Sequence, residues 1–136
     1  MISQVRVGLA AGIATINGLN VDPNGLVQGA ITPPTAVILP GEPYLEYSVT
    51  MGDEVYDLRF TVLLIVGAAY SPENQQALDN YLEPTGAMSI RAAVHSHVTT
   101  AYDYAIVRRA FSIGMFEYAG QQYYGAQLTV EVACSV

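Results

Sequence analysis

The last third of the chain constrains the fold most, because it has the pattern of two strands folded back on one another. Residues 106–118 form a first arm, residues 119–121 a turn and residues 122–132 a return arm. One face of the return arm is apolar and comprises Tyr124, Ala126, Leu128, Val130 and Val132. The other face comprises Gln127, Thr129 and Glu131, with Tyr123 and Gly125. Such alternation is typical of a half-buried antiparallel strand, so the sequence predicts a closing β-hairpin.

An earlier segment predicts a second hairpin, with arms at residues 44–50 and 54–66 around a turn at residues 51–53. In its longer arm one face comprises Tyr56, Leu58, Phe60, Val62, Leu64 and Val66. The opposite face is polar as far as Thr61 and apolar beyond it, as in a central strand that is covered on both sides. A shorter strand is predicted at residues 35–39, and Pro40 and Gly41 are expected to end it.

Three segments have the spacing of helices. Residues 3–16 carry one apolar stripe, with Ser3 as the expected N-cap. A second helix is predicted to begin at Ser71 and Pro72, and a third to cover about residues 88–97. The order is helix, strand, hairpin, two helices, hairpin. It predicts a single α+β domain over residues 1–136, with an antiparallel sheet built from two hairpins and the helices mainly on one face.

The composition points to a protein that contacts other proteins. Charged residues make up 12% of the chain, against roughly 25% in ordinary globular domains, and 51% are hydrophobic. Burial against other subunits is the simplest explanation, and the alternative is a monomer whose surface is rich in uncharged polar residues. The chain has no lysine and a formal net charge of −7, which argues against a protein that clamps nucleic acid.

No motif indicates catalysis. His95 and His97 are two apart on a predicted helix, so they point roughly 200° apart and do not share a metal. Asp53, Glu54 and Asp57 are interpreted as a solvated group near a turn. Nucleophile-elbow and phosphate-binding glycine motifs are absent from the sequence. We therefore expect no enzyme activity, no cofactor and no metal.

The cysteine count and the hydropathy of the chain indicate whether we should expect disulfides, export or membrane binding. The single Cys134 excludes an intramolecular disulfide and is interpreted as a small apolar filler. The N-terminal residues do not have the pattern of an export signal. The longest apolar run, residues 62–70, is about half of the ~20 residues that a membrane-spanning helix needs. We expect a soluble protein that is neither exported nor bound to a membrane.

Two surface features are candidates for contacts. Arg108 and Arg109 are predicted on opposite faces of one strand, where an arginine can pair with Glu131 or Glu117 across the hairpin or with an acidic residue of another subunit. The tyrosines gather at predicted strand ends and turns, which suits either a protein interface or ordinary β-propensity. They are Tyr44, Tyr47, Tyr56, Tyr102, Tyr104, Tyr118, Tyr123 and Tyr124.

Several segments together resemble the tail terminator proteins of long-tailed phages, particularly those of actinobacterial hosts. The segments are ATINGLNV (14–21), PPTAVILP (33–40), LRFTVLLIV (58–66), QALDNYLEPTG (76–86), SIRAAV (89–94) and YGAQLTVEV (124–132). Residues 78–94 contribute most to this resemblance, which covers nearly the whole chain. It is a pattern of segments and not a catalytic signature.

The resemblance implies a structural virion protein of a siphovirus-type phage, assembled in the host cytoplasm and located at the junction of tail and neck. Members of that family form a hexameric ring on the head-proximal end of the tail tube, which ends tube polymerisation and joins the tail to the neck. The implied partners are further copies of the chain, the major tail tube protein and the head–tail connector or stopper protein. DNA passes through the lumen without specific binding, and an acidic lumen would let it slide.

The predicted contact residues lie in the two hairpin turns and their flanks, in the loop after residue 21 and at the arginine pair. They are Asp22, Asn24, Tyr44, Tyr47, Met51, Asp53, Glu54, Arg108, Arg109, Tyr118, Gln121 and Tyr123. Two alternatives stay open. One is another neck protein, a head–tail stopper or adaptor. The other is a small oligomeric α+β domain that binds or hydrolyses a ligand, which a deep pocket with convergent polar groups would favour.

Overall fold

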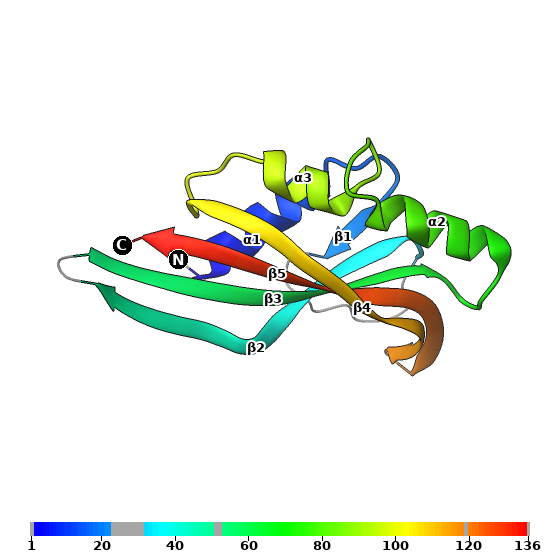
Figure 1. The fold of residues 1–136 in the computed structure, drawn as a ribbon. Helices are drawn as coiled ribbons and strands as arrows, with labels where there is room; N and C mark the ends of the chain where they lie inside the picture. Colours follow the sequence, from blue (N-terminus) through cyan, green and yellow to red (C-terminus); the bar gives the residue numbers. More distant parts are fainter. Residues whose placement is uncertain (1, 23–31, 51–52, 119, 136) are drawn as a thin grey trace.

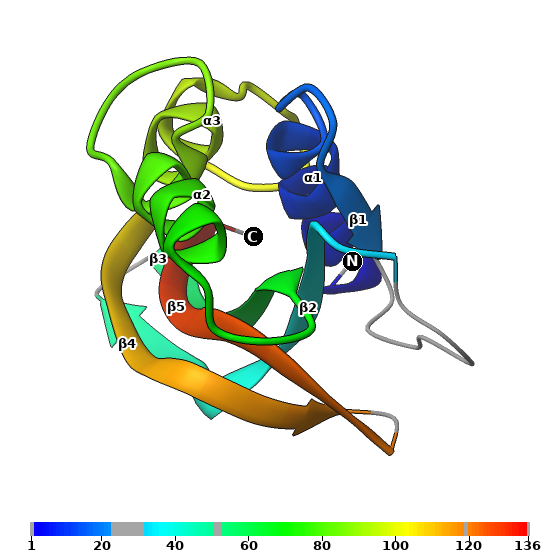
Figure 2. The same cartoon turned by 90° about the vertical axis from the view of Figure 1, so that its right-hand side faces the viewer.

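The computed structural model describes residues 2–22, 32–50, 53–118 and 120–135, which form a curved sheet with three helices on one face (Figure 1). The elements are α1 (Ile2–Ile13), β1 (Asn20–Asp22), β2 (Thr35–Thr50), β3 (Asp53–Gly67), α2 (Pro72–Leu82), α3 (Ile90–Ser96), β4 (Tyr104–Tyr118) and β5 (Gln121–Ser135). The α+β class is confirmed. The helices share one side of the sheet (Figure 2), and the other side is called the open face below.

The five strands have the order β1-β2-β3-β5-β4. Both predicted hairpins form, β2 with β3 and β4 with β5, and the two central strands β3 and β5 are antiparallel. The prediction of a purely antiparallel sheet is wrong at one edge, because β1 runs parallel to β2, from Asn20 opposite Thr35 to Asp22 opposite Val37. Residues 23–34 separate these two strands, and a connection of about a dozen residues is long enough for a parallel return.

Strand β2 continues through Pro40 and Gly41, where the sequence predicted its end. The register shifts between Pro40 and Leu45, so residues 41–44 lie opposite Arg59 alone. Beyond Val37 no described strand pairs with the outer side of β2, and an edge strand tolerates a proline because its outward N–H has no partner to lose. At Gly41 a Cβ would lie 2.8 Å from the carbonyl carbon of Arg59, so the close approach of the two strands requires glycine.

The core lies between the sheet and the helices. The predicted apolar faces of β3 and β5 are buried in one cluster with Val5, Leu9 and Ile13 of α1, Leu78 and Tyr81 of α2, and Ile90 and Val94 of α3. A smaller cluster of Val37, Leu63, Ile65 and Tyr123 occupies the open face, where the end of the β4–β5 hairpin bends under the sheet (Figure 1). The prediction that β3 is covered on both sides beyond Thr61 is therefore confirmed.

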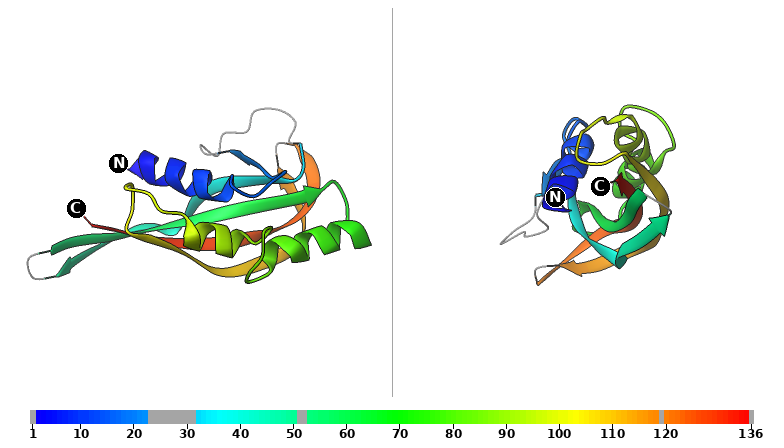
Figure 3. Two further views of the ribbon diagram at one scale, coloured as in Figure 1. Left: turned by 90° about the horizontal axis from the view of Figure 1, so that it is seen from above. Right: turned by 90° about the vertical axis from the view of Figure 1, so that its left-hand side faces the viewer.

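Side-chain caps explain where two of the helices begin. The Ser71 hydroxyl oxygen accepts a hydrogen bond from the Asn74 N–H at 3.1 Å, as predicted for α2, and the Ser89 hydroxyl accepts one from Ala92 at 3.0 Å at the start of α3. The predicted cap at Ser3 is wrong, because α1 already includes Ile2, which packs against the core. Seen from above in Figure 3, the helices lie along the sheet and the β2–β3 hairpin extends beyond them.

Candidate protein interface on the open face and the sheet edges

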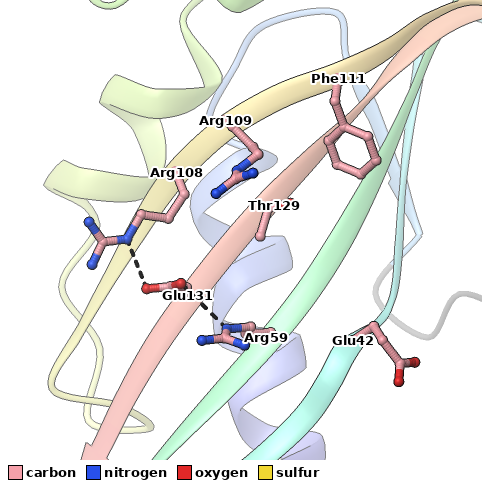
Figure 4. A pocket seen from close by; sticks show the side chains of 7 residues that line it. All are labelled: Glu42, Arg59, Arg108, Arg109, Phe111, Thr129 and Glu131. Carbon is pink, nitrogen blue, oxygen red and sulfur yellow. Dashed lines mark hydrogen bonds and ion pairs between the residues drawn. The ribbon is translucent and has the colours of Figure 1, made fainter.

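The open face holds a hollow of about 440 Å³ that spans four strands (Figure 4). Its lining residues are Glu42 of β2, Arg59 of β3, Arg108, Arg109 and Phe111 of β4, and Thr129 and Glu131 of β5. Three of the five arginines of this acidic chain therefore lie in one hollow. This concentration of positive charge makes the open face the strongest candidate for a contact surface.

Glu131 joins two of these arginines. Its carboxylate oxygens lie 3.4 Å from Nε of Arg59 and 2.8 Å from Nε of Arg108 (Figure 4), and Arg59 also pairs with Glu46 at 3.1 Å. These groups remain between 31% and 52% exposed, so solvent screens each pair and its stabilising effect is at most about 1 kcal/mol. The network orients the guanidinium groups on the open face more than it holds the fold together.

The structure corrects the placement of the arginine pair. Arg108 and Arg109 line the same hollow and are not confined to opposite faces of β4. The register of β4 on β5 shifts between Val107 and Arg109, so Arg108 is an additional residue in a bulge and its side chain is redirected. Arg108 makes the predicted pair with Glu131 inside the chain. Among the described residues, Arg109 and Glu42 have no ion-pair partner.

Replacing Glu131 by glutamine tests the network. Because the three charges are partly solvated, we expect Glu131→Gln to lower the free energy of unfolding by no more than about 1 kcal/mol, and high salt to reduce this difference. Urea unfolding at low and high ionic strength measures both effects, with Glu83→Gln as the control, because Glu83 is exposed beyond α2. A loss of several kcal/mol would contradict the solvated character of the network.

The two long edges of the sheet are exposed and unlike each other. Strand β4 is outermost on one side and carries Tyr104, Phe111, Ile113 and Met115, whose side chains are 56%, 37%, 54% and 47% exposed. Strand β2 has no described partner on its outer side beyond Val37, and its Tyr47 is 80% exposed. A long edge strand with exposed apolar side chains is a surface on which another chain can dock.

The twelve predicted contact residues fall into four groups in the structure. Asn24 and Met51 lie outside the described residues, and Asp22, Asp53, Glu54 and Tyr118 are described only as backbone at strand ends. Tyr47, Arg108, Arg109 and Gln121 are exposed on the sheet. Tyr44 and Tyr123 are largely covered by the chain itself.

The contacts of these two tyrosines show why they offer little free surface. The ring of Tyr44 packs edge-on against Phe60 at 5.6 Å, and its hydroxyl accepts a hydrogen bond from Arg6. Tyr123 belongs to the cluster on the open face, and its hydroxyl donates to Gln121 at 3.2 Å.

Sequence reasoning did not identify Glu42, Arg59 and Phe111 as members of the candidate surface. A signal existed for Arg59, because it shares the polar face of β3 with Asp57 and Thr61. It meets Glu131 because β3 and β5 are neighbours in the sheet, with Arg59 directly opposite Glu131. Because β4 lies between β3 and β5 in the chain, the two predicted hairpins gave no indication that β3 and β5 are neighbours in the sheet.

The described part of the chain also contains a buried free thiol and two histidines. Burial raises the pKa of the Cys134 thiol, so the thiol stays protonated near neutral pH, unlike an activated nucleophile. No three His, Cys, Asp or Glu side chains among the described residues are placed to hold a metal ion. A second hollow, of about 480 Å³ beside α1, has His97 as its one titratable lining residue.

Comparisons with known proteins add no relative to this picture. A scan against protein-family models finds no match, and a search of the curated proteins also finds none. None of the described helices has the length and apolar character needed to cross a membrane. The function is therefore inferred from the residues themselves and from the geometry of the sheet.

Proposed function

We propose that this chain is a structural virion protein, a tail terminator that assembles as a ring on the head-proximal end of a phage tail tube. The observation that carries the proposal is the 15-residue edge strand β4, which exposes apolar side chains along its length. Such a strand is a liability in a monomer and a natural contact surface in an assembly. That this assembly is a ring on a tail tube is inferred from the resemblance of six segments to tail terminators.

The unlike edges of the sheet support a ring over a twofold dimer. A contact between two different surfaces of neighbouring copies is heterologous, and it produces a closed ring when the rotation between copies closes. The net charge of −7 suits a ring through which DNA passes, because an acidic lumen repels phosphate. The ring subunits then meet the tube on one side and the neck proteins on the other.

The two alternatives receive less support from the geometry. In the hollow on the open face, Glu131 already pairs with two of the arginines, so few polar groups are left to converge on a small ligand. A stopper or adaptor would share the exposed edges and differ in its partner. The choice between a terminator and another neck protein therefore depends on whether the chain binds the tail tube or the connector of the capsid.

Polymerisation of the tail tube tests the proposed function. The purified chain is added to the major tail tube protein encoded by the same genome, and tubes are examined by electron microscopy. We expect shorter tubes with a ring at one end, and a sixfold species by native mass spectrometry. The capsid with its connector is the comparison partner. Binding to that capsid without binding to tubes would move the assignment to a stopper or adaptor, and binding to neither would reject the virion role.

A further inference from the structure

We infer that neighbouring copies in the ring meet edge to edge, with the middle of β4 in one copy against the bulged part of β2 in the next, and with Arg109 facing Glu42 of the neighbouring copy. This inference rests on the proposed function, because it names the surface by which the ring forms. Strand direction, the level of each residue along the sheet and charge all bear on this contact.

Strand direction permits the contact. Because β2 is antiparallel to β3, β3 to β5 and β5 to β4, the two edge strands β2 and β4 run in opposite directions. When copies repeat side by side by rotation, β4 of one copy therefore lies antiparallel to β2 of the next. The contact therefore continues the antiparallel order of the four long strands.

The two edges also carry irregular points at neighbouring levels. Across the sheet, Glu46 lies level with Tyr104, and Leu39 lies level with Arg109. Residues 41–44, which form the bulge of β2, lie opposite Arg59 and are therefore level with Ile106 of β4, two register steps from Arg109. Side-by-side copies bring the bulge that contains Glu42 opposite Ile106, so Arg109 reaches along the edge of β4 to meet Glu42.

The charges of the two edges are complementary. Strand β2 carries Glu42 and Glu46 and no basic residue, whereas the middle of β4 carries Arg108 and Arg109. Arg109 and Glu42 are both exposed and have no ion-pair partner among the described residues, so each is available to the neighbouring copy. The exposed Phe111 and Ile113 follow Arg109 on the same edge and add apolar contact area.

The irregular edges favour side-chain recognition over continuous backbone pairing. Pro40, Pro43 and the bulge interrupt the outer side of β2, and two register shifts interrupt β4. An interrupted edge does not template an open-ended sheet, so the charged pair sets which surfaces meet. The competing arrangement is a twofold contact between two β4 edges, which would set Arg109 against Glu117 and would close at a dimer.

Charge reversal on each edge tests the inference with the full chain. Arg109→Glu and Glu42→Arg each place like charges across the contact, and we expect each to raise the dissociation constant of the assembly at least about tenfold. In an equimolar mixture the two variants can alternate around the ring, and every contact in such a ring joins opposite charges. The mixture, and the double variant R109E/E42R, are therefore expected to assemble like the wild type in native mass spectrometry and sedimentation.

A charge change away from the sheet edges serves as the matched control. Glu83→Arg makes the same charge change as Glu42→Arg at an exposed position outside the sheet and is expected to leave assembly unchanged. Single variants that assemble like the wild type, a mixture that stays dissociated, or a wild type that is monomeric at every concentration would overturn the edge contact. Rescue of Arg109→Glu by Glu117→Arg would assign the contact to the twofold arrangement. Tube capping decides the proposed function separately, because a chain that caps tubes while the edge contact fails is still a terminator.

Discussion

Replacing Gly125 by alanine is expected to prevent the chain from reaching its native fold. Gly125 lies in β5 opposite Ile65, and a Cβ there would overlap the carbonyl oxygen of Leu64 and lie 3.1 Å from the Cα of Ile65. Both neighbours are backbone atoms of β3, which is held between β2 and β5 and has no room to move. We expect a loss of at least about 4 kcal/mol, the exceptional end of single substitutions. Soluble yield and urea unfolding followed by circular dichroism measure it.

Gly18→Ala is the matched control for this substitution. Gly18 has a φ of +83°, but a Cβ there meets no atom within 4 Å. The only cost is the left-handed backbone conformation, roughly 1–2 kcal/mol, so this variant should fold. A Gly125→Ala protein as stable as Gly18→Ala would show that β3 and β5 are not as close at this point as the structure has them.

Phe60→Ala is expected to lower the free energy of unfolding by about 3–5 kcal/mol. Phe60 is fully buried in the middle of β3, within the cluster that joins the sheet to all three helices. Its removal leaves a cavity between the sheet and the helix layer, and Tyr44 loses the ring against which it packs at 5.6 Å. Domains of this size are stable by about 5–15 kcal/mol, so the substitution removes a large share of the free energy of unfolding. Chemical unfolding at low protein concentration gives the difference.

Phe111→Ala removes the same side chain from the opposite face of the sheet. Phe111 is 37% exposed at the rim of the hollow, so we expect the stability of the isolated chain to change by less than about 1 kcal/mol. The contrast between the two phenylalanines separates the core from the candidate contact surface. Equal losses at the two positions would mean that the open face is part of the core.

Local patterns in the sequence predicted most of the elements. Alternation in residues 54–66 and 122–132 identified the buried faces of β3 and β5, because a strand places every second side chain on the same side. Ser71 and Pro72 marked the start of α2, because serine can accept a backbone N–H and proline has no N–H to leave unpaired. Both signals depend only on neighbours in the chain.

The errors occurred where a distant segment decides the local structure. Pro40 did not end β2, because the free outer edge of the sheet tolerates a residue that cannot donate a hydrogen bond. Arg109 reached the same hollow as Arg108 because a bulge against β5 changed the register. The parallel pairing of β1 depends on where the chain returns, which no periodicity records.

The sequence by itself determined which face of β3 and of β5 packs against the helices, because that face follows from the period of apolar residues. It also determined the low and acidic charge that excludes a basic nucleic-acid clamp. Only the tertiary structure decided that β3 lies beside β5, which joins Arg59, Arg108 and Glu131 on one face. It also decided that β4, and β2 beyond Val37, have no described partner strand on their outer sides, because strand order depends on contacts between segments that are far apart in the chain.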